Sequence, residues 1–169
     1  MEENNVGKWD NWYKNLPKKP GSFLYGETET YKKAADFLSD CSEIEDWGCG
    51  AGGFSRFVPD VIGIDGSGTP FATKKYIDLK TYTSDCEAIH IRHVLEHNYM
   101  WANILENALK SARKKLVITM FIPLNNDITK EIAHNKIHGV DVPDMSISKS
   151  DFFKIVNKYN PSDIKIEYL

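Results

Sequence analysis

Cysteine is scarce in this sequence, and no apolar run is long enough to cross a bilayer. The chain has 3 cysteines, Cys41, Cys49 and Cys86, without C-x-x-C spacing, so we expect neither a disulfide framework nor a thiolate zinc site. The longest apolar stretch, residues 116–124, is shorter than the about 20 residues that a membrane helix needs. The first residues, Met1 to Asn5, are hydrophilic and acidic, unlike a signal peptide. These absences predict a cytoplasmic protein without a membrane segment.

The chain also lacks a basic face. Its formal net charge is −3, and its longest basic run is Arg113-Lys114-Lys115. Because nucleic-acid-binding proteins usually carry clustered Lys and Arg, a DNA or RNA partner is disfavoured. With 169 residues and 41% hydrophobic content, the sequence predicts one globular domain with a single core.

Segments with strand and helix patterns alternate through the middle of the chain. This alternation is typical of βαβ units, so the sequence predicts an α/β fold with a mostly parallel sheet and helices on both faces. The predicted strands are residues 43–47, 61–65, 75–78, 87–92, 115–122 and a final 164–169. The predicted helices are residues 9–13, 28–38, 101–112, 127–137 before Gly139, and 151–159 after the capping residue Ser148.

A glycine-rich turn follows the first predicted strand. Asp46 lies two residues before Gly48, which begins a match to the dinucleotide pattern G-x-G-x-x-G. A pyrophosphate binds at a helix N-terminus, but Asp46 would repel its charge and Pro59 keeps the following helix short. S-adenosylmethionine instead brings a cationic ammonium and a sulfonium, which a carboxylate attracts. Asp65 closes the next strand, where its carboxylate is placed to accept hydrogen bonds from two ribose hydroxyls. The pattern therefore favours S-adenosylmethionine over a nicotinamide dinucleotide.

Four segments, taken in order, resemble the class I S-adenosylmethionine-dependent methyltransferases over about residues 43–124. Asp46-Trp47-Gly48-Cys49-Gly50-Ala51-Gly52 resembles the family's motif I, and residues 61–67 resemble the strand with the ribose acid. Tyr76-Ile77-Asp78-Leu79 is similar to the segment whose acid contacts the adenine amino group, and residues 86–97 to the fourth strand and its V-L-E-H turn. The resemblance implies a Rossmann-like sheet and S-adenosylmethionine as the cofactor. It implies these cofactor-binding residues: Asp46, Gly48, Cys49, Gly50, Gly52, Asp65, Gly66, Asp78, Leu79 and Arg92.

The resemblance also implies how the single domain is divided. Residues 1–40 would form an N-terminal helical lid, residues 43–124 the cofactor-binding core, and residues 125–169 the acceptor side and the closing segment. The aromatic residues before the core (Trp9, Trp12, Tyr13 and Tyr25) could belong to this lid or could simply pack. The family usually closes its sheet with two strands, whereas this chain has residues for one, which implies a shortened C-terminal end.

The turn His93-Val94-Leu95-Glu96-His97 admits three interpretations. It matches H-x-x-E-H, the inverted zinc-protease motif, but that motif needs a helix and His93 follows a predicted strand. A metal-assisted methyltransferase would use His93, Glu96 and His97, with His134 or His138 as a further ligand. We favour His93 as a general base or acceptor contact, with the adjacent Arg92 as a second candidate catalytic residue and no metal, while a purely structural turn stays open.

Together these features predict methyl transfer from S-adenosylmethionine to oxygen or nitrogen of a small polar acceptor. The alternatives are a non-catalytic S-adenosylmethionine-binding regulatory or partner protein, and the metal-assisted enzyme described above. Among partners we expect a small-molecule acceptor, and a homodimer stays open. The sequence does not identify the acceptor or the atom that is methylated.

Overall fold

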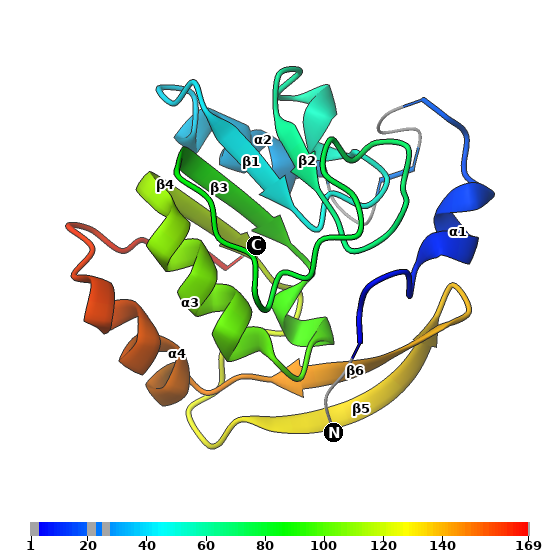
Figure 1. The fold of residues 1–169 in the computed structure, drawn as a ribbon. Coiled ribbons are helices and arrows are strands. Elements are labelled where there is room, and N and C mark those ends of the chain that lie inside the picture. The colour runs from blue at the N-terminus through cyan, green and yellow to red at the C-terminus, as the bar shows by residue number, and fades with distance from the viewer. Residues whose placement is uncertain (1–3, 20–22, 25–27, 169) are drawn as a thin grey trace.

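A four-stranded parallel sheet forms the centre of the computed structural model, which describes residues 4–19, 23–24 and 28–168 (Figure 1). The strands are β1 (Ile44–Trp47), β2 (Ile62–Ile64), β3 (Cys86–Arg92) and β4 (Ala112–Thr119), in the order β2-β1-β3-β4. All three strand pairs are parallel, and Asp46 of β1 lies opposite His90 of β3. Four of the strands predicted from the sequence are thereby confirmed.

Helices cover both faces of this sheet, as predicted. On one face lies α2 (Thr28–Phe37), and on the other lies α3 (Trp101–Ser111), against which α4 (Lys149–Val156) packs (Figure 1). The α3 side buries the larger cluster, around Trp47, Ile89 and Leu105, and the α2 side buries a smaller one around Leu38 and Phe54. None of the helices in the described ranges is long and apolar enough to cross a membrane.

Short elements complete the chain. A five-residue helix, α1 (Asp10–Lys14), agrees with the helix predicted over 9–13. Single 3₁₀ turns span Phe54–Arg56, Leu95–His97 and Asn157–Tyr159. The predicted cap of α4 is confirmed, because the Ser148 hydroxyl accepts a hydrogen bond from the Asp151 amide at 3.0 Å.

The predicted helix over 127–137 is wrong, because this segment forms a β-hairpin. Strands β5 (Lys130–Ile137) and β6 (Val140–Ser146) pair antiparallel around the two-residue turn His138-Gly139. Both turn residues have positive φ, +50° and +83°, which suits the right-handed twist of a hairpin. The prediction took Gly139 as the residue just past a helix end, whereas Gly139 lies in the turn of the hairpin. Ile128 and Ile132 are mostly exposed.

Two further strand predictions are wrong. Residues 75–78 make no strand, because Tyr76 adopts a left-handed φ of +57° and only Lys74 bridges to Ile64. Residues 164–168 are exposed and irregular, and Leu169 lies outside the described residues. Within the described ranges, the sheet therefore ends at β4 without the closing strand expected from the sequence.

Candidate functional site

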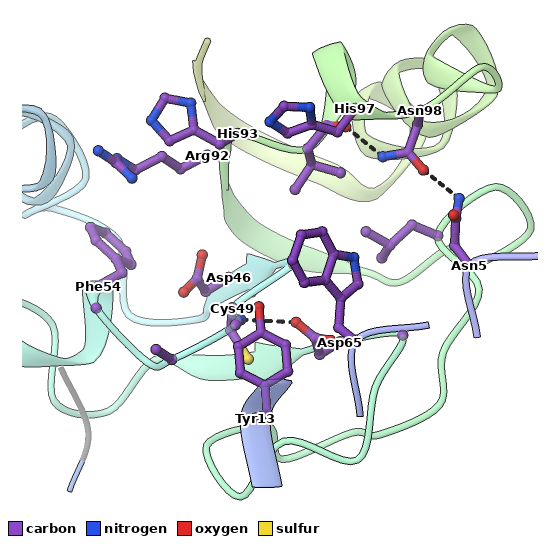
Figure 2. Close-up of a pocket in the computed structure, with 18 of the residues that line it drawn as sticks. Asn5, Tyr13, Asp46, Cys49, Phe54, Asp65, Arg92, His93, His97 and Asn98 are labelled. Carbon is purple, nitrogen blue, oxygen red and sulfur yellow. Dashed lines mark hydrogen bonds between the residues drawn. The ribbon is translucent and has the colours of Figure 1, made fainter. Parts of the chain in front are cut away.

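A cavity of about 420 Å³ opens where β1, β2 and β3 end at the same edge of the sheet (Figure 2). Ligands of open α/β sheets bind at this edge, because the loops that follow parallel strands converge there. Its lining includes the following residues predicted from the sequence: Asp46, Gly48, Cys49, Gly50, Asp65, Gly66, Asp78, Leu79, Arg92 and His93. Gly52, the remaining predicted site residue, does not line the cavity and instead shapes the turn, with φ +70°.

The turn after β1 requires glycine at two positions. Gly48 and Gly50 have φ of +76° and +51°, in the left-handed region that other residues rarely adopt. A Cβ atom on Gly48 would lie 2.4 Å from Cγ2 of Val94, and one on Gly50 would lie 2.7 Å from the hydroxyl of Tyr13. The glycines therefore let the backbone pack closely against Val94 and Tyr13, where any side chain would overlap them.

Asp65, the predicted ribose acid, is buried and holds the turn together. One carboxylate oxygen accepts from the Gly50 amide at 2.8 Å, and the other accepts from the amide and hydroxyl of Ser67 at 2.8 and 2.6 Å. Burial raises the pKa of Asp65, and these hydrogen bonds oppose the increase. Each carboxylate oxygen has more than one lone-pair site, so Asp65 can still accept a hydrogen bond from a ligand.

Three other predicted cofactor-binding residues, Gly66, Asp78 and Leu79, lie in the loop that follows β2. The Asp78 carboxylate accepts from the Lys80 amide at 3.1 Å and lies 3.4 Å from the Lys80 ammonium. Leu79 is buried beside it. The Gly66 carbonyl accepts from the Gly7 amide at 2.7 Å, which docks the N-terminal segment at this end. Burial raises the pKa of Cys49 well above its usual value, so its side chain is a neutral thiol and a poor nucleophile.

A carboxylate and an imidazole form a buried pair on the α2 side of the cavity. Asp46 is 4% exposed and His90 is 1% exposed, and Oδ1 of Asp46 lies 2.7 Å from Nδ1 of His90. The His90 ring stacks on Phe54, with ring centroids 3.9 Å apart. The sequence prediction missed His90, although it alternates with Arg92 along a strand and so points to the same face.

Arg92 lies at the same end of the cavity (Figure 2). Its guanidinium donates to the hydroxyls of Thr30 and Tyr31 at 3.1 and 3.3 Å and lies over the Tyr31 ring at 4.3 Å. Burial lowers the pKa of Arg92, and nearby Tyr31, Glu96 and Asp46 oppose that decrease. An arginine titrates far above neutral pH, so its charge is retained.

His93 follows β3 and is oriented by a buried carboxylate. Its φ is +54°, and its Nδ1 lies 2.9 Å from Oε1 of Glu96, which also accepts from the Phe121 amide at 3.1 Å. Glu96 is 0% exposed. A proton on Nδ1 directed at Glu96 leaves Nε2 as an acceptor, which is the tautomer a general base needs.

His97 makes its own contacts from the next turn. Its Nδ1 lies 3.1 Å from the Pro143 carbonyl and 3.2 Å from Oδ1 of Asp144, both in β6. The Phe121 ring lies between the two histidine rings, 5.5 Å from that of His93 and 5.4 Å from that of His97. The hairpin adds Ile137 and Val142 to the lining, so this end of the cavity is largely apolar and aromatic.

The residues proposed for a metal do not converge. In the part of the chain that the structure describes, no group of three or more His, Cys, Asp or Glu side chains is arranged to hold a metal ion. His134 pairs with Glu131 at 2.9 Å, and His138 stacks on Trp12 with centroids 3.8 Å apart. Neither histidine lines the cavity. His93 precedes a single 3₁₀ turn, not the long helix that the zinc-protease motif requires.

The N-terminal segment forms one wall of the cavity. Trp9 and Tyr13 line it, and Asp10 accepts from the Gly68 amide at 2.7 Å. Asn5 donates to Asn98 on the side of the cavity opposite Arg92 (Figure 2). Trp12 packs on His138 instead, and Tyr25 lies outside the described residues. The position of Trp9 and Tyr13 supports the lid hypothesis, which stays a prediction.

Comparisons with known proteins bear on the fold. No protein-family model and no curated protein matches the chain. Among solved structures, the N-terminal domain of EvdMO1 with bound S-adenosylhomocysteine has a TM-score of 0.56 and 13% identity, over 88% of this chain and 84% of that one. The magnesium protoporphyrin IX methyltransferase of Synechocystis PCC 6803, also with S-adenosylhomocysteine, has a TM-score of 0.54 and 14% identity, over 78% of this chain and 72% of that one. At such low identity the likeness establishes a shared fold.

Proposed function

We propose that this chain, which has the fold of the class I S-adenosylmethionine-dependent methyltransferases, transfers a methyl group from S-adenosylmethionine to a hydroxyl group of a small acceptor. The observation that carries the proposal is a pair of opposite charges at one end of the glycine-turn cavity. Asp46 and Arg92 both line it, and within the described ranges they form no ion pair with each other. An amino acid zwitterion has the matching charges, an ammonium for Asp46 and a carboxylate for Arg92.

The rest of the cavity fits the remainder of that cofactor. Gly48 and Gly50 line the cavity as bare backbone, which a ligand can approach closely. Asp65 and Asp78 present carboxylates that suit ribose hydroxyls and an adenine amino group, and Leu79 offers an apolar contact for the base. An acid in the glycine turn disfavours a pyrophosphate and therefore a nicotinamide dinucleotide.

We assign the proton transfer to His93. When bound, S-adenosylmethionine supplies an electrophilic methyl group on a sulfonium. Nε2 of His93 takes the proton from the acceptor hydroxyl while the hydroxyl oxygen forms its bond to the methyl carbon, and the carbon–sulfur electron pair returns to sulfur. Glu96 holds the His93 ring and stabilises the imidazolium that results. Phe121, Ile137 and Val142 line this end of the cavity and offer apolar contacts to the acceptor.

The chain offers a matched control for this assignment. His134 and Glu131 repeat the spacing and the 2.9 Å contact of His93 and Glu96, but His134 is exposed and outside the cavity. The experiment measures production of S-adenosylhomocysteine with a panel of small hydroxyl and amine acceptors. His93→Ala should lower the catalytic rate about 10²–10⁴-fold with cofactor affinity nearly unchanged, and His134→Ala should change neither.

The outcomes separate the candidate functions. Equal turnover by His93→Ala and the wild-type protein would show that methyl transfer proceeds by positioning alone. Cofactor binding without turnover on any acceptor would favour the non-catalytic alternative. Faster turnover with amines than with hydroxyl compounds would assign N-methylation in place of O-methylation.

A further inference from the structure

Asp46 pairs with His90, a buried residue that has no role in the proposed chemistry. The two residues lie opposite each other on adjacent parallel strands, and their side chains meet at 2.7 Å on the α2 side of the sheet. Phe54 stacks on the imidazole and fixes the plane of the ring. Nε2 of His90 is buried and has no hydrogen-bond partner among the described residues. The imidazole is therefore buried with only one of its two nitrogens hydrogen-bonded, which lowers the stability of the fold. A buried group of this kind calls for a functional explanation.

Arg92 lies within reach of Asp46. It lies two residues beyond His90 on β3, so its Cα is roughly 8 Å from that of Asp46, given the usual strand spacing and rise. An extended arginine side chain can reach a carboxylate at that distance. Burial strengthens the attraction between the two charges, because the effective dielectric constant falls. Asp46 and Arg92 are thus expected to pair, yet no ion pair joins them in the described part of the chain.

Different partners hold the two charges apart. The His90 imidazole binds Asp46, whereas the Tyr31 ring and the hydroxyls of Thr30 and Tyr31 hold Arg92. Figure 2 shows Asp46 and Arg92 as separate side chains at the Phe54 end of the cavity. If the contact to His90 were lost, Asp46 would be free to turn toward the guanidinium. The resulting ion pair would satisfy both charges and close the space between them.

We propose that His90 is a positioning residue that keeps Asp46 away from Arg92, so that the ammonium and carboxylate groups of an α-amino acid can enter between them. This inference rests on the proposed function, in which S-adenosylmethionine carries that amino acid. In addition, recognition of the amino acid part of the ligand then depends on His90, a residue that need not touch the reacting atoms. The adenosine end of the ligand, bound near Asp65 and Asp78, should be insensitive to His90.

Two ligands isolate this effect. S-adenosylhomocysteine contains the amino acid, whereas 5′-methylthioadenosine shares the adenosine and the thioether but lacks it. Titration calorimetry with the wild-type protein should show stronger binding of S-adenosylhomocysteine. In His90→Leu the affinity for S-adenosylhomocysteine should fall about 10–100-fold, as for loss of a charged hydrogen-bonding contact, and that for methylthioadenosine should stay within about twofold.

Two further variants test the contact itself. The Asn side-chain amide occupies nearly the position of Nδ1, so His90→Asn should recover most of the affinity for S-adenosylhomocysteine. His90→Gln places its amide farther from the backbone and should recover less. If His90→Leu does not fold, His90→Asn and His90→Gln are compared with each other instead. The quantity compared is the ratio of the affinity for S-adenosylhomocysteine to the affinity for methylthioadenosine.

Specific outcomes would overturn the inference. An equal loss of affinity for both ligands would mean that His90 only supports the fold. Unchanged affinity for S-adenosylhomocysteine in His90→Leu would show that Asp46 needs no partner, while the proposed function would stand. Binding of neither ligand by the wild-type protein would overturn the proposed function, and with it the role of His90.

Discussion

Asp65 shows how one side chain serves both the fold and the site. Its carboxylate accepts hydrogen bonds from the Gly50 amide and from the amide and hydroxyl of Ser67, so it sets the shape of the turn that faces the cavity. Hydrogen bonds to an ionised acceptor are roughly twice as strong as neutral ones. Any change at Asp65 is therefore expected to affect stability and ligand binding together, and the two must be measured separately.

We predict that Asp65→Ala weakens binding of S-adenosylhomocysteine by about 10- to more than 100-fold, equivalent to about 1.5–3 kcal/mol. Calorimetry measures the binding, and urea unfolding measures the accompanying loss of stability. Asp60→Ala is the control, because Asp60 is exposed and does not line the cavity. Equal effects of the two substitutions on affinity would contradict the special role of Asp65.

A second residue prediction compares two glycines with similar backbone angles. Gly48 has φ +76° and Gly139 has φ +83°, but a Cβ on Gly139 would meet nothing within 4 Å. Gly139→Ala should cost about 1–2 kcal/mol of folding stability from backbone strain alone. Gly48→Ala should cost about 1–3 kcal/mol more, because the new methyl group overlaps Val94.

Urea unfolding of both variants checks this difference, and Val94→Ala provides the internal test. Added to Gly48→Ala, it should restore part of the lost stability, because it removes the atom that the new Cβ meets. Equal costs for the two glycine substitutions would show that the backbone angle, and not the close approach of Val94, requires glycine at position 48.

Among the elements, strand β1 carries a buried carboxylate on each of its two faces. Asp46 points toward α2 and the cavity, whereas Glu45 and Trp47 point toward the α3 side. Glu45 is buried there and accepts from Trp47 Nε1 and Ser84 Oγ at 2.8 Å each, and from Lys74 and Tyr82 at 3.1 Å each. This set of donors joins β1 to the loop before β3 and stabilises the centre of the sheet.

The Glu45 contacts predict a pH dependence of stability. Burial raises the pKa of Glu45, but the hydrogen bonds from Trp47, Ser84 and Lys74 outweigh it, so the net pKa lies below the ordinary 4.5. A carboxyl group whose pKa is lower in the folded state stabilises the fold above its unfolded pKa, and the contribution is lost as the pH falls through the folded value. The free energy of unfolding should therefore decrease below about pH 4.5, and this decrease should be shallower in Glu45→Gln.

A control separates this effect from other carboxylates. The pKa of Glu87 is also lowered, to about 2, by Lys114 and the Ser42 amide, but the Lys114 contact lies at the surface and is screened by salt. Glu87→Gln should therefore flatten the acid limb more at low than at high ionic strength, because salt screens the Lys114 contact but not the hydrogen bond from the Ser42 amide. Urea unfolding between pH 3 and 7 at two salt concentrations, about 0.01 and 0.5 M, would test both variants. Identical acid limbs in Glu45→Gln and the wild-type protein would contradict the prediction.

At the scale of the whole molecule, segments far apart in sequence enclose one cavity. The N-terminal segment contributes Asn5 and Tyr13, the end of β3 contributes Arg92, and the hairpin contributes Ile137 and Val142. A ligand that fills this cavity contacts all of them and binds only the folded chain. Its binding energy is therefore added to the free energy of unfolding of the whole domain.

We predict that S-adenosylhomocysteine at a hundredfold excess over its dissociation constant stabilises the protein by about 2.7 kcal/mol. For a chain of this size, that is an increase in Tm of about 5–11 °C, which a thermal-shift assay measures. NAD serves as the control and should have no effect, because Asp46 repels its pyrophosphate. A response to NAD alone would contradict the assignment of the cofactor.

Much of the candidate site could be predicted because its residues lie within two short local patterns. Asp46 lies in the first strand just before the turn with Gly48 and Gly50, and Asp65 follows the next strand, so spacing along the chain was enough to propose a shared edge. His90 was missed because a histidine within an apolar strand has no local signal of function. Its importance depends on strand register, which places it opposite Asp46.

Local patterns in the chain were enough to predict the alternation of strands and helices and the glycine turn, because hydrophobic periodicity and backbone requirements act over a few neighbouring residues. Long-range contacts were needed to show that residues 130–146 form a hairpin, that Arg92 and Asp46 share a cavity without pairing, and that Glu96 orients His93. Those outcomes depend on contacts that fold the chain back on itself and on φ angles at single residues such as Tyr76 and His93. Gly139 suits both the position after a helix and the turn of a hairpin, so only the pairing of β5 with β6 distinguishes the two.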